Sequence, residues 1–191
     1  MQHEIKSQIL ETAETLQKVS SELSGTIQII IEKIVECYEN GGCVYFFGNG
    51  GSAADCQHLA AEFVCRFKIN RKPLPAFALT TDTSFLTACG NDYSFEDIFG
   101  RQVEAFAKKG DIFVGISTSG NSKNVFKGLQ KAKELGATTV AFLGGTGGII
   151  KDVADIALII PTKNTPKVQE CHITVGHIIC DLVEKEIFEK R

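Results

Sequence analysis

The stretch Cys43–Phe67 reads CVYFFGNGGSAADCQHLAAEFVCRF. Its apolar start at 43–47 is typical of a buried strand, and it ends in Gly48-Asn49-Gly50-Gly51-Ser52, after which a helical pattern begins at once. Glycines at such a turn let the backbone approach a ligand, and Ser52 is expected to cap the helix. The free N–H groups and the dipole of that helix start favour an anion. The stretch therefore predicts a strand, an anion-binding loop and a helix.

Four polar side chains on two helices suggest chemistry next to this loop. His58 and Glu62 are four residues apart, so they share a helix face. On the last predicted helix, Gln169 and His177 are eight residues apart, a little over two turns, and also share a face. Two imidazoles, a carboxylate and an amide oxygen can hold a borderline divalent metal such as Zn²⁺. Without a metal, the same groups can divide the roles of base and acid. The plainer alternative is that His58 and Glu62 are only a solvated pair.

The rest of the chain alternates between helical and strand patterns. Helices are expected over 4–24, 26–39, 80–90, 95–108, 123–135 and 165–189, the first two broken near Ser24-Gly25, and further strands over 76–79, 111–116, 138–143 and 156–160. This alternation predicts an α/β fold: a three-layer αβα sandwich with a five-stranded parallel sheet in the flavodoxin-like order 2-1-3-4-5. We expect one domain over 1–191, with N-terminal helices in 1–40 and the α/β core with the C-terminal helix in 41–191.

A second loop supports phosphate binding over the other interpretations of the first. Residues 117–122 read STSGNS and follow a predicted strand that lies next to the first strand in this order, so both loops open at the same sheet edge. Hydroxyls and helix-start amides can together satisfy a phosphate. Residues 48–53 also fit the dinucleotide pattern G-x-G-x-x-A, with Asp82 as ribose-binding acid, but that pattern alone is weak. A tight strand–helix turn without a ligand is the third alternative.

Composition limits which kinds of partner and which cellular compartment are expected. The 20 Lys and Arg against 23 Asp and Glu give a net charge of −3, and no basic run occurs, so no nucleic-acid partner is expected. No apolar stretch approaches the roughly 18–20 residues of a membrane span, and the polar N-terminus does not resemble a secretory signal. Seven cysteines, odd in number and without a C-x-x-C pair, indicate reduced thiols and hence a cytoplasmic protein.

Four longer motifs carry a family resemblance. They are GNGGSAADCQHLAAEF at 48–63, TTDTSFLTACGNDYSFEDIFGRQVEA at 80–105, GISTSGNSKNV at 115–125 and QECHITVGHIICDLVE at 169–184. Together they resemble the sugar-isomerase (SIS) domain and, within it, the bacterial phosphoheptose isomerases. The resemblance runs from about Tyr38 to the C-terminus.

The resemblance implies an activity and an assembly. It implies conversion of sedoheptulose 7-phosphate to D-glycero-D-manno-heptose 7-phosphate, an aldose–ketose isomerisation through an enediol(ate) that starts the synthesis of activated heptose for lipopolysaccharide, capsule or S-layer glycans. It also implies a homotetramer that uses the N-terminal helices and has its active sites between subunits, with one Zn²⁺ per subunit. His177 is accordingly expected to reach Glu62 from a neighbouring subunit.

The resemblance also assigns roles to single residues. Glu62 would be the base and His177 the acid, and the metal ligands would be His58, Glu62, Gln169 and His177. Substrate contacts would come from the two loops, the 91–92 turn and the two helices: Asn49, Gly50, Gly51, Ser52, Glu62, Asn91, Asp92, Ser117, Thr118, Ser119, Ser122 and Gln169. The rival is a non-catalytic SIS module, either a sugar-phosphate sensor or a replication-initiator-associating adaptor. Relatives of that kind keep the loops but resemble this chain less at the acid–base positions.

Overall fold

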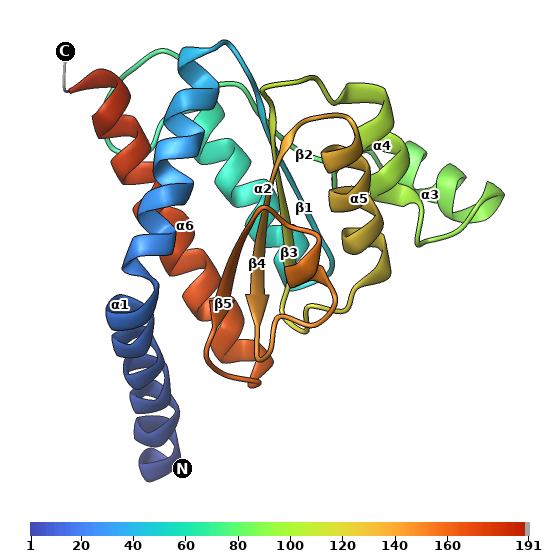
Figure 1. Cartoon of the computed structure of the whole chain (residues 1–191). Coiled ribbons are helices and arrows are strands. Elements are labelled where there is room, and N and C mark those ends of the chain that lie inside the picture. Colours follow the sequence, from blue (N-terminus) through green and yellow to red (C-terminus); the bar gives the residue numbers. More distant parts are fainter. Residues whose placement is uncertain (190–191) are drawn as a thin grey trace.

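A computed structural model describes residues 1–189 of the chain (Figure 1). The strands are β1 (Val44–Gly48), β2 (Ala76–Ala78), β3 (Ile112–Ser117), β4 (Thr138–Gly144) and β5 (Ile156–Ile160). The helices are α1 (Gln2–Glu39), α2 (Gly51–Val64), α3 (Thr83–Asp92), α4 (Ile98–Phe106), α5 (Lys123–Glu134), the 3₁₀ turn η1 (Ile150–Asp152) and α6 (Thr165–Phe188). The strands are all parallel in the order β2-β1-β3-β4-β5, which confirms the predicted fold class.

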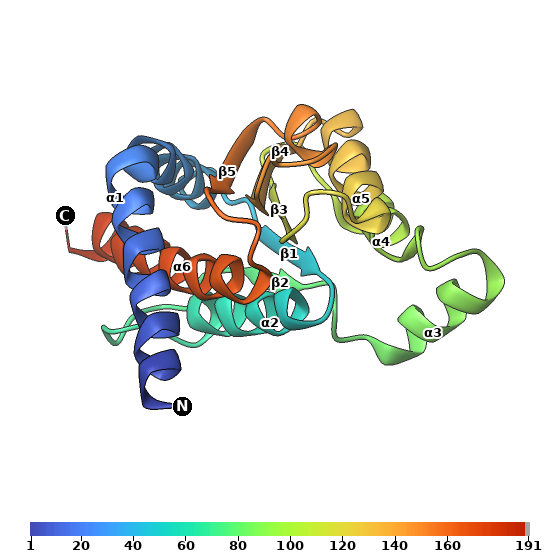
Figure 2. The same cartoon turned by 90° about the horizontal axis from the view of Figure 1, so that it is seen from below.

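Helices cover both faces of this sheet, as parallel sheets require. In Figure 2, α1, α2 and α6 lie on one face, and α4 and α5 lie on the other. The core is split accordingly: Phe46 packs into the first layer and its neighbour Phe47 into the second, because successive side chains of a strand point to opposite faces. All six residues of β3 are buried, since this strand lies in the middle of the sheet. The sandwich therefore has two separate apolar layers.

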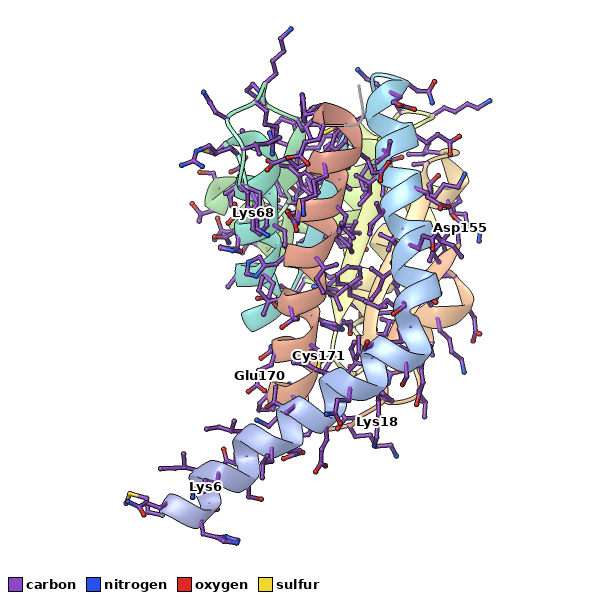
Figure 3. The ribbon with its side chains drawn as sticks, turned by 90° about the vertical axis from the view of Figure 1, so that its left-hand side faces the viewer. Lys6, Lys18, Lys68, Asp155, Glu170 and Cys171 are labelled. Atoms are coloured by element: carbon purple, nitrogen blue, oxygen red, sulfur yellow. The ribbon has the colours of Figure 1, made fainter. Side chains whose placement is uncertain are left out.

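The predicted break in the N-terminal helix is wrong. α1 is continuous from Gln2 to Glu39, although it bends near its middle, past the labelled Lys18 in Figure 3. Ser21 and Ser24 accompany the bend, because their hydroxyls donate to backbone carbonyls of the preceding turn, a contact that often bends a helix. A single glycine at position 25 costs a helix only about 1 kcal/mol, which packing of the following apolar face can offset.

The segment after β2 also differs from expectation. Asp82, which the dinucleotide alternative would place on a ribose, is the N-cap of α3 and accepts a hydrogen bond of 2.9 Å from the Phe85 N–H. The helix therefore begins later than predicted and ends later, so Asn91 and Asp92 lie in its last turn and not in a connecting turn. Within residues 1–189, no helix is long and apolar enough to cross a membrane.

Candidate active site

The first loop forms where β1 comes very close to β3. A Cβ on Gly48 would lie 2.8 Å from the carbonyl oxygen of Ile116, so only glycine fits there. Gly50 has a φ of +56° and is the N-cap of α2, so the helix begins at Gly51. Ser52 is then already inside the first turn, buried, and makes no capping bond. The predicted capping by Ser52 is therefore wrong, because a glycine in the left-handed region ends the loop earlier.

The second loop lies beside the first, as predicted. Ser117 ends β3 and Ser122 is the N-cap of α5, and their hydroxyl oxygens are 2.9 Å apart. The loop is braced from behind, because the Ile150 N–H donates to the carbonyl of Gly120 at 3.0 Å. The side-chain amide of Asn121 donates a hydrogen bond of 2.9 Å to the backbone carbonyl of Ser119. Thr118 and Ser122 are half-buried and Ser119 is exposed, so hydroxyl groups remain accessible along this loop.

A residue that the sequence analysis did not single out joins the two loops. The buried side-chain amide of Asn124 exchanges two hydrogen bonds with that of Asn49, each 2.9 Å long. Asn124 stands in the first turn of α5, directly after the second loop, while Asn49 belongs to the first. The pair therefore holds the two candidate phosphate loops at a fixed separation. Only the register of β1 against β3 reveals it, since asparagines are common near turns.

Three of the four predicted metal ligands, including the predicted base and acid, meet in one cluster. The Nε2 atoms of His58 and His177 are 2.9 Å apart, and Oε1 of Glu62 lies 3.2 Å from Nε2 of His58. One potential ligand atom from each residue lies within 4.8 Å of the others. His58 is exposed, while Glu62 and His177 are half-buried. The structure thus brings Glu62 and His177 of the same chain together. The expectation that His177 reaches Glu62 from a neighbouring subunit is therefore wrong, because α2 and α6 of one chain already lie against each other.

The cluster forms because α2 and α6 run side by side in the same direction. Near their starts, a Cβ on Gly51 would lie 2.5 Å from Nε2 of Gln169, and farther along, a Cβ on Gly176 would lie 2.6 Å from Leu59. His58 and His177 follow at that level. Gln169 precedes His177 by eight residues, about 12 Å along the helix, so it lies against the first loop. Within this chain the metal-ligand role of Gln169 stays a prediction.

The donor set of the cluster fits a borderline divalent ion. Ligands that each bond a tetrahedral Zn²⁺ at roughly 2.0–2.1 Å lie about 3.3 Å from one another. The separations of 2.9 and 3.2 Å between the nitrogen and oxygen atoms of His58, His177 and Glu62 are close to that value. Two imidazoles with one carboxylate are also a set that catalytic zinc sites use.

Two other predicted substrate contacts lie elsewhere in the chain. Asn91 and Asp92 are exposed at the end of α3, which projects away from α2 and α6 (Figure 2). Their side chains bond each other at 2.8 Å. Within one chain, the structure does not bring them to the His58–Glu62–His177 cluster.

The remaining reactive side chains have other roles. His172 is buried, and its Nε2 contacts the carbonyl of Leu143 at 3.0 Å, which agrees with a structural histidine. Burial raises the pKa of the Cys171 thiol to about 11 and raises that of Cys180 further, so neither forms a thiolate readily. All seven cysteines are unpaired. Burial also raises the pKa of Asp55, one turn before His58, and its Oδ2 has no hydrogen-bond partner among the described residues.

Comparison with known proteins identifies the class. The SIS domain profile matches residues 9–144, and this chain belongs to the SIS domain family. The phosphoheptose isomerase of Clostridium acetobutylicum is 52% identical over 193 residues, which cover 100% of this chain and 98% of that protein.

Solved structures agree with this assignment. The structure of phosphoheptose isomerase from Neisseria gonorrhoeae superimposes with a TM-score of 0.92 at 39% identity, covering 96% of this chain and 98% of the other. The Vibrio vulnificus NanR protein, solved with ManNAc-6P, has a TM-score of 0.67 at 13% identity, which shows a shared fold alone. The resemblance to phosphoheptose isomerases found in the sequence is therefore confirmed.

Proposed function

We propose that this chain is a phosphoheptose isomerase that converts sedoheptulose 7-phosphate to D-glycero-D-manno-heptose 7-phosphate. The observation that carries the proposal is the cluster of Glu62, His58 and His177, whose ligand atoms lie within 4.8 Å of one another on α2 and α6. α2 begins at the first of two loops rich in glycine and hydroxyl groups. An aldose–ketose isomerisation of a sugar phosphate needs a base and an acid beside the reacting carbons and benefits from an anchor for the phosphate. The carboxylate, the imidazoles and the loops can supply these three functions.

In this reaction Glu62 acts as the base. Its carboxylate removes the proton from the carbon beside the carbonyl group, which gives an enediol(ate), and returns the proton to the neighbouring carbon. His177 moves the second proton between the two oxygens. Because a carbon acid beside a carbonyl is weak, the base alone is insufficient, and the charge that develops on oxygen needs a donor directed at it. The imidazole of His177 can supply that donor.

The proposed cofactor is one Zn²⁺ per subunit, held by His58, Glu62 and His177, with Gln169 as the fourth predicted ligand. When bound, it would supply a Lewis acid for the oxygen on which charge develops, and would take the place of the proton that Nε2 of His177 donates in the metal-free site. A carboxylate has two oxygens, so Glu62 can keep one toward the two imidazoles while the other faces the substrate carbon. The Nε2 atoms of His58 and His177 face each other at 2.9 Å from adjacent helices, so both could turn toward the same ion.

The phosphate is proposed to bind at the two loops. Asn49, Gly50, Gly51 and Ser52 would contact it from the first loop, and Ser117, Thr118, Ser119 and Ser122 from the second. Backbone N–H groups at the starts of α2 and α5 add the favourable end of each helix dipole. Holding the phosphate in this way makes the proton transfer effectively unimolecular.

The finer features are proposals of the same kind. We propose a homotetramer formed through the N-terminal helix, in which Asn91 and Asp92 reach the active site of a neighbouring subunit, since α3 carries them away from the cluster of their own chain. Seven unpaired cysteines favour the cytoplasm. The product would supply activated heptose for surface glycans such as lipopolysaccharide. The non-catalytic alternative is disfavoured, because a sensor or adaptor does not need Glu62 beside two imidazoles.

A turnover assay tests the proposal. Purified protein incubated with sedoheptulose 7-phosphate should form the aldose phosphate, observed by NMR. A metal chelator should abolish most of this activity, and added Zn²⁺ should restore it, because the ion stabilises the developing charge. Fructose 6-phosphate, a shorter ketose phosphate, serves as the control substrate and should react more slowly. Binding of sedoheptulose 7-phosphate without any product would support the sensor alternative and contradict the isomerase.

A further inference from the structure

A buried ion pair lies beyond the described site, where the segment after α2 meets α6. Nε of Arg71 donates to Oε2 of Glu184 at 2.7 Å, and each side chain is only 2% exposed. Buried charges are costly unless hydrogen bonds satisfy them fully, so such a pair is retained where it fixes a geometry.

Both partners of this pair are fully engaged with backbone groups. The Glu184 carboxylate also accepts from three consecutive N–H groups, those of residues 67, 68 and 69, at 3.0, 2.8 and 2.8 Å. Burial opposes ionisation of Glu184, but these hydrogen bonds and Arg71 outweigh it and lower the pKa of the carboxyl. The Arg71 guanidinium donates to the carbonyls of Glu62 at 2.9 Å and Phe63 at 2.8 Å. The pair thus ties α6 to the last turn of α2 through residues 67–71.

These contacts lead directly to the catalytic cluster. Arg71 binds the main chain of Glu62 itself, the proposed base. Glu184 follows His177 by seven residues, two helical turns, and so lies on the same face of α6. Phe67, whose N–H binds Glu184, places its ring against the imidazole of His177, with centroids 5.6 Å apart and planes at 26°. In Figure 3, the labelled Lys68 marks this segment beside α2 and α6.

We infer that Arg71 and Glu184 are positioning residues that set the register of α2 against α6, and that Phe67 fixes the ring orientation of His177. The inference rests on the proposed function, since it concerns the same Glu62 and His177. A shift of one helix along the other would separate the two Nε2 atoms that now lie 2.9 Å apart. The ion pair acts only through other residues, because it touches neither the loops nor the imidazoles.

The test compares three variants of the full chain. Glu184→Gln keeps the size of the side chain but turns an N–H donor toward groups that themselves donate. Phe67→Leu removes the ring and leaves every hydrogen bond of Glu184, since residue 67 contributes its backbone there. The control is Lys185→Met, at the residue directly after Glu184. It removes an ion pair of the exposed Lys185 with Asp181. Circular dichroism establishes folding, calorimetry gives the Zn²⁺ affinity of metal-free protein, and kinetics give kcat and KM.

Positioning predicts a specific pattern. Glu184→Gln should lower kcat about 10- to 100-fold and Zn²⁺ affinity by a similar factor, with KM for sedoheptulose 7-phosphate changed less than about 2-fold, because the loops are intact. Phe67→Leu should also lower kcat and Zn²⁺ affinity, by about 10-fold or less. Lys185→Met should change neither kcat nor Zn²⁺ affinity. If Glu184→Gln does not fold, Glu184→Asp, which keeps the charge but is one methylene shorter, takes its place with the same expected pattern. Phe67→Leu tests the ring contact with His177 alone.

Some results would overturn the inference. Folded variants with unchanged kcat and Zn²⁺ affinity would do so, and so would a rise in KM alone. Absence of turnover in the unmodified chain would instead contradict the proposed function, and the comparison of Zn²⁺ affinities would still decide whether these residues position the cluster.

Discussion

His172 shows how burial alone sets the chemistry of a residue. The residue is 1% exposed. Its Nε2 has the carbonyl of Leu143 as an acceptor at 3.0 Å, so this nitrogen carries the proton. The other ring nitrogen, Nδ1, is buried without a partner among the described residues. A second proton there would be buried without an acceptor, and burial accordingly lowers the pKa of His172 to about 4.

This residue should make the fold sensitive to acid. Below its unfolded-state pKa of about 6.5, the imidazole takes up a proton in the unfolded chain but not in the fold until about pH 4. The unfolded state therefore binds more protons, and stability is lost as the pH falls, by up to about 1.4 kcal/mol per unit in this window. Urea unfolding at pH 7, 6 and 5 should show a shallower loss for His172→Gln. His3→Gln, at an exposed position, is the control and should match the unmodified chain. Equal slopes for all three would refute the assignment.

At the same scale, the sequence was informative where spacing alone decides. The interval of four between His58 and Glu62 predicts a shared helix face, and the structure has them 3.2 Å apart. The capping role of Ser52 was wrong because a positive φ at Gly50 cannot be read from composition. Asn124 and Phe67 could not be recognised, since their partners lie 75 and 110 residues away in the chain, and only the packed elements bring them together.

At the scale of elements, the loops after β1 and β3 behave as one unit. The exchange of two amide hydrogen bonds between Asn49 and Asn124 joins them. Each such bond contributes about 0.5–1.5 kcal/mol, and the partner that remains buried alone costs more. The shape of the proposed phosphate site therefore depends on both side chains.

Removing one side chain of this pair should weaken substrate binding. Asn124→Ala should raise KM for sedoheptulose 7-phosphate about tenfold, equal to about 1.4 kcal/mol, with a smaller effect on kcat because the acid–base cluster lies on other elements. Steady-state kinetics measure this. Asn40→Ala, at the exposed end of α1, is the matched control and should leave KM unchanged. A variant of Asn124 with normal KM would show that the loops do not need the pair.

Elements could be predicted well where their pattern is strong. The strands are found within a residue of their expected ends. Their alternation with helices predicted a parallel sheet, and their order is the common flavodoxin-like one that was expected. The expected limits of α3 were wrong by two to three residues, because Asp82 caps the helix. The apolar periodicity of this segment is too weak to mark where the helix begins or ends. The break at Ser24-Gly25 was wrong because packing of Ile27, Ile30 and Ile34 against the body outweighs the local preference.

At the scale of the whole molecule, an apolar surface runs along α1 and α6. The two helices border a groove of about 800 Å³ that includes Leu16, Ile27, Ile178 and Leu182. The first turns of α1, marked by Lys6 in Figure 3, project beyond the sheet, where Ile5, Ile9 and Leu10 are more than half exposed. Contiguous apolar surface of this kind is typical of contacts between protein chains.

The proposed homotetramer predicts that this surface holds the subunits together. Leu182→Glu should leave the chain folded, because the side chain is already 38% exposed, but should shift sedimentation from tetramer to smaller species. Turnover should fall with the loss of the tetramer if Asn91 and Asp92 act across subunits. Lys185→Met, on the same helix, should sediment as the unmodified chain does. A monomer for the unmodified chain at micromolar concentration would contradict the assembly.

The central claim is that the Glu62 carboxylate transfers the carbon proton of a sugar phosphate bound beside it. The direct measurement is kcat for sedoheptulose 7-phosphate in Glu62→Gln at saturating Zn²⁺, together with binding of the same ligand by calorimetry. Because a positioned base contributes about 10²- to 10⁴-fold, kcat should fall by that factor while the ligand still binds. A variant that binds the ligand and retains kcat within about threefold of the unmodified chain would contradict the account.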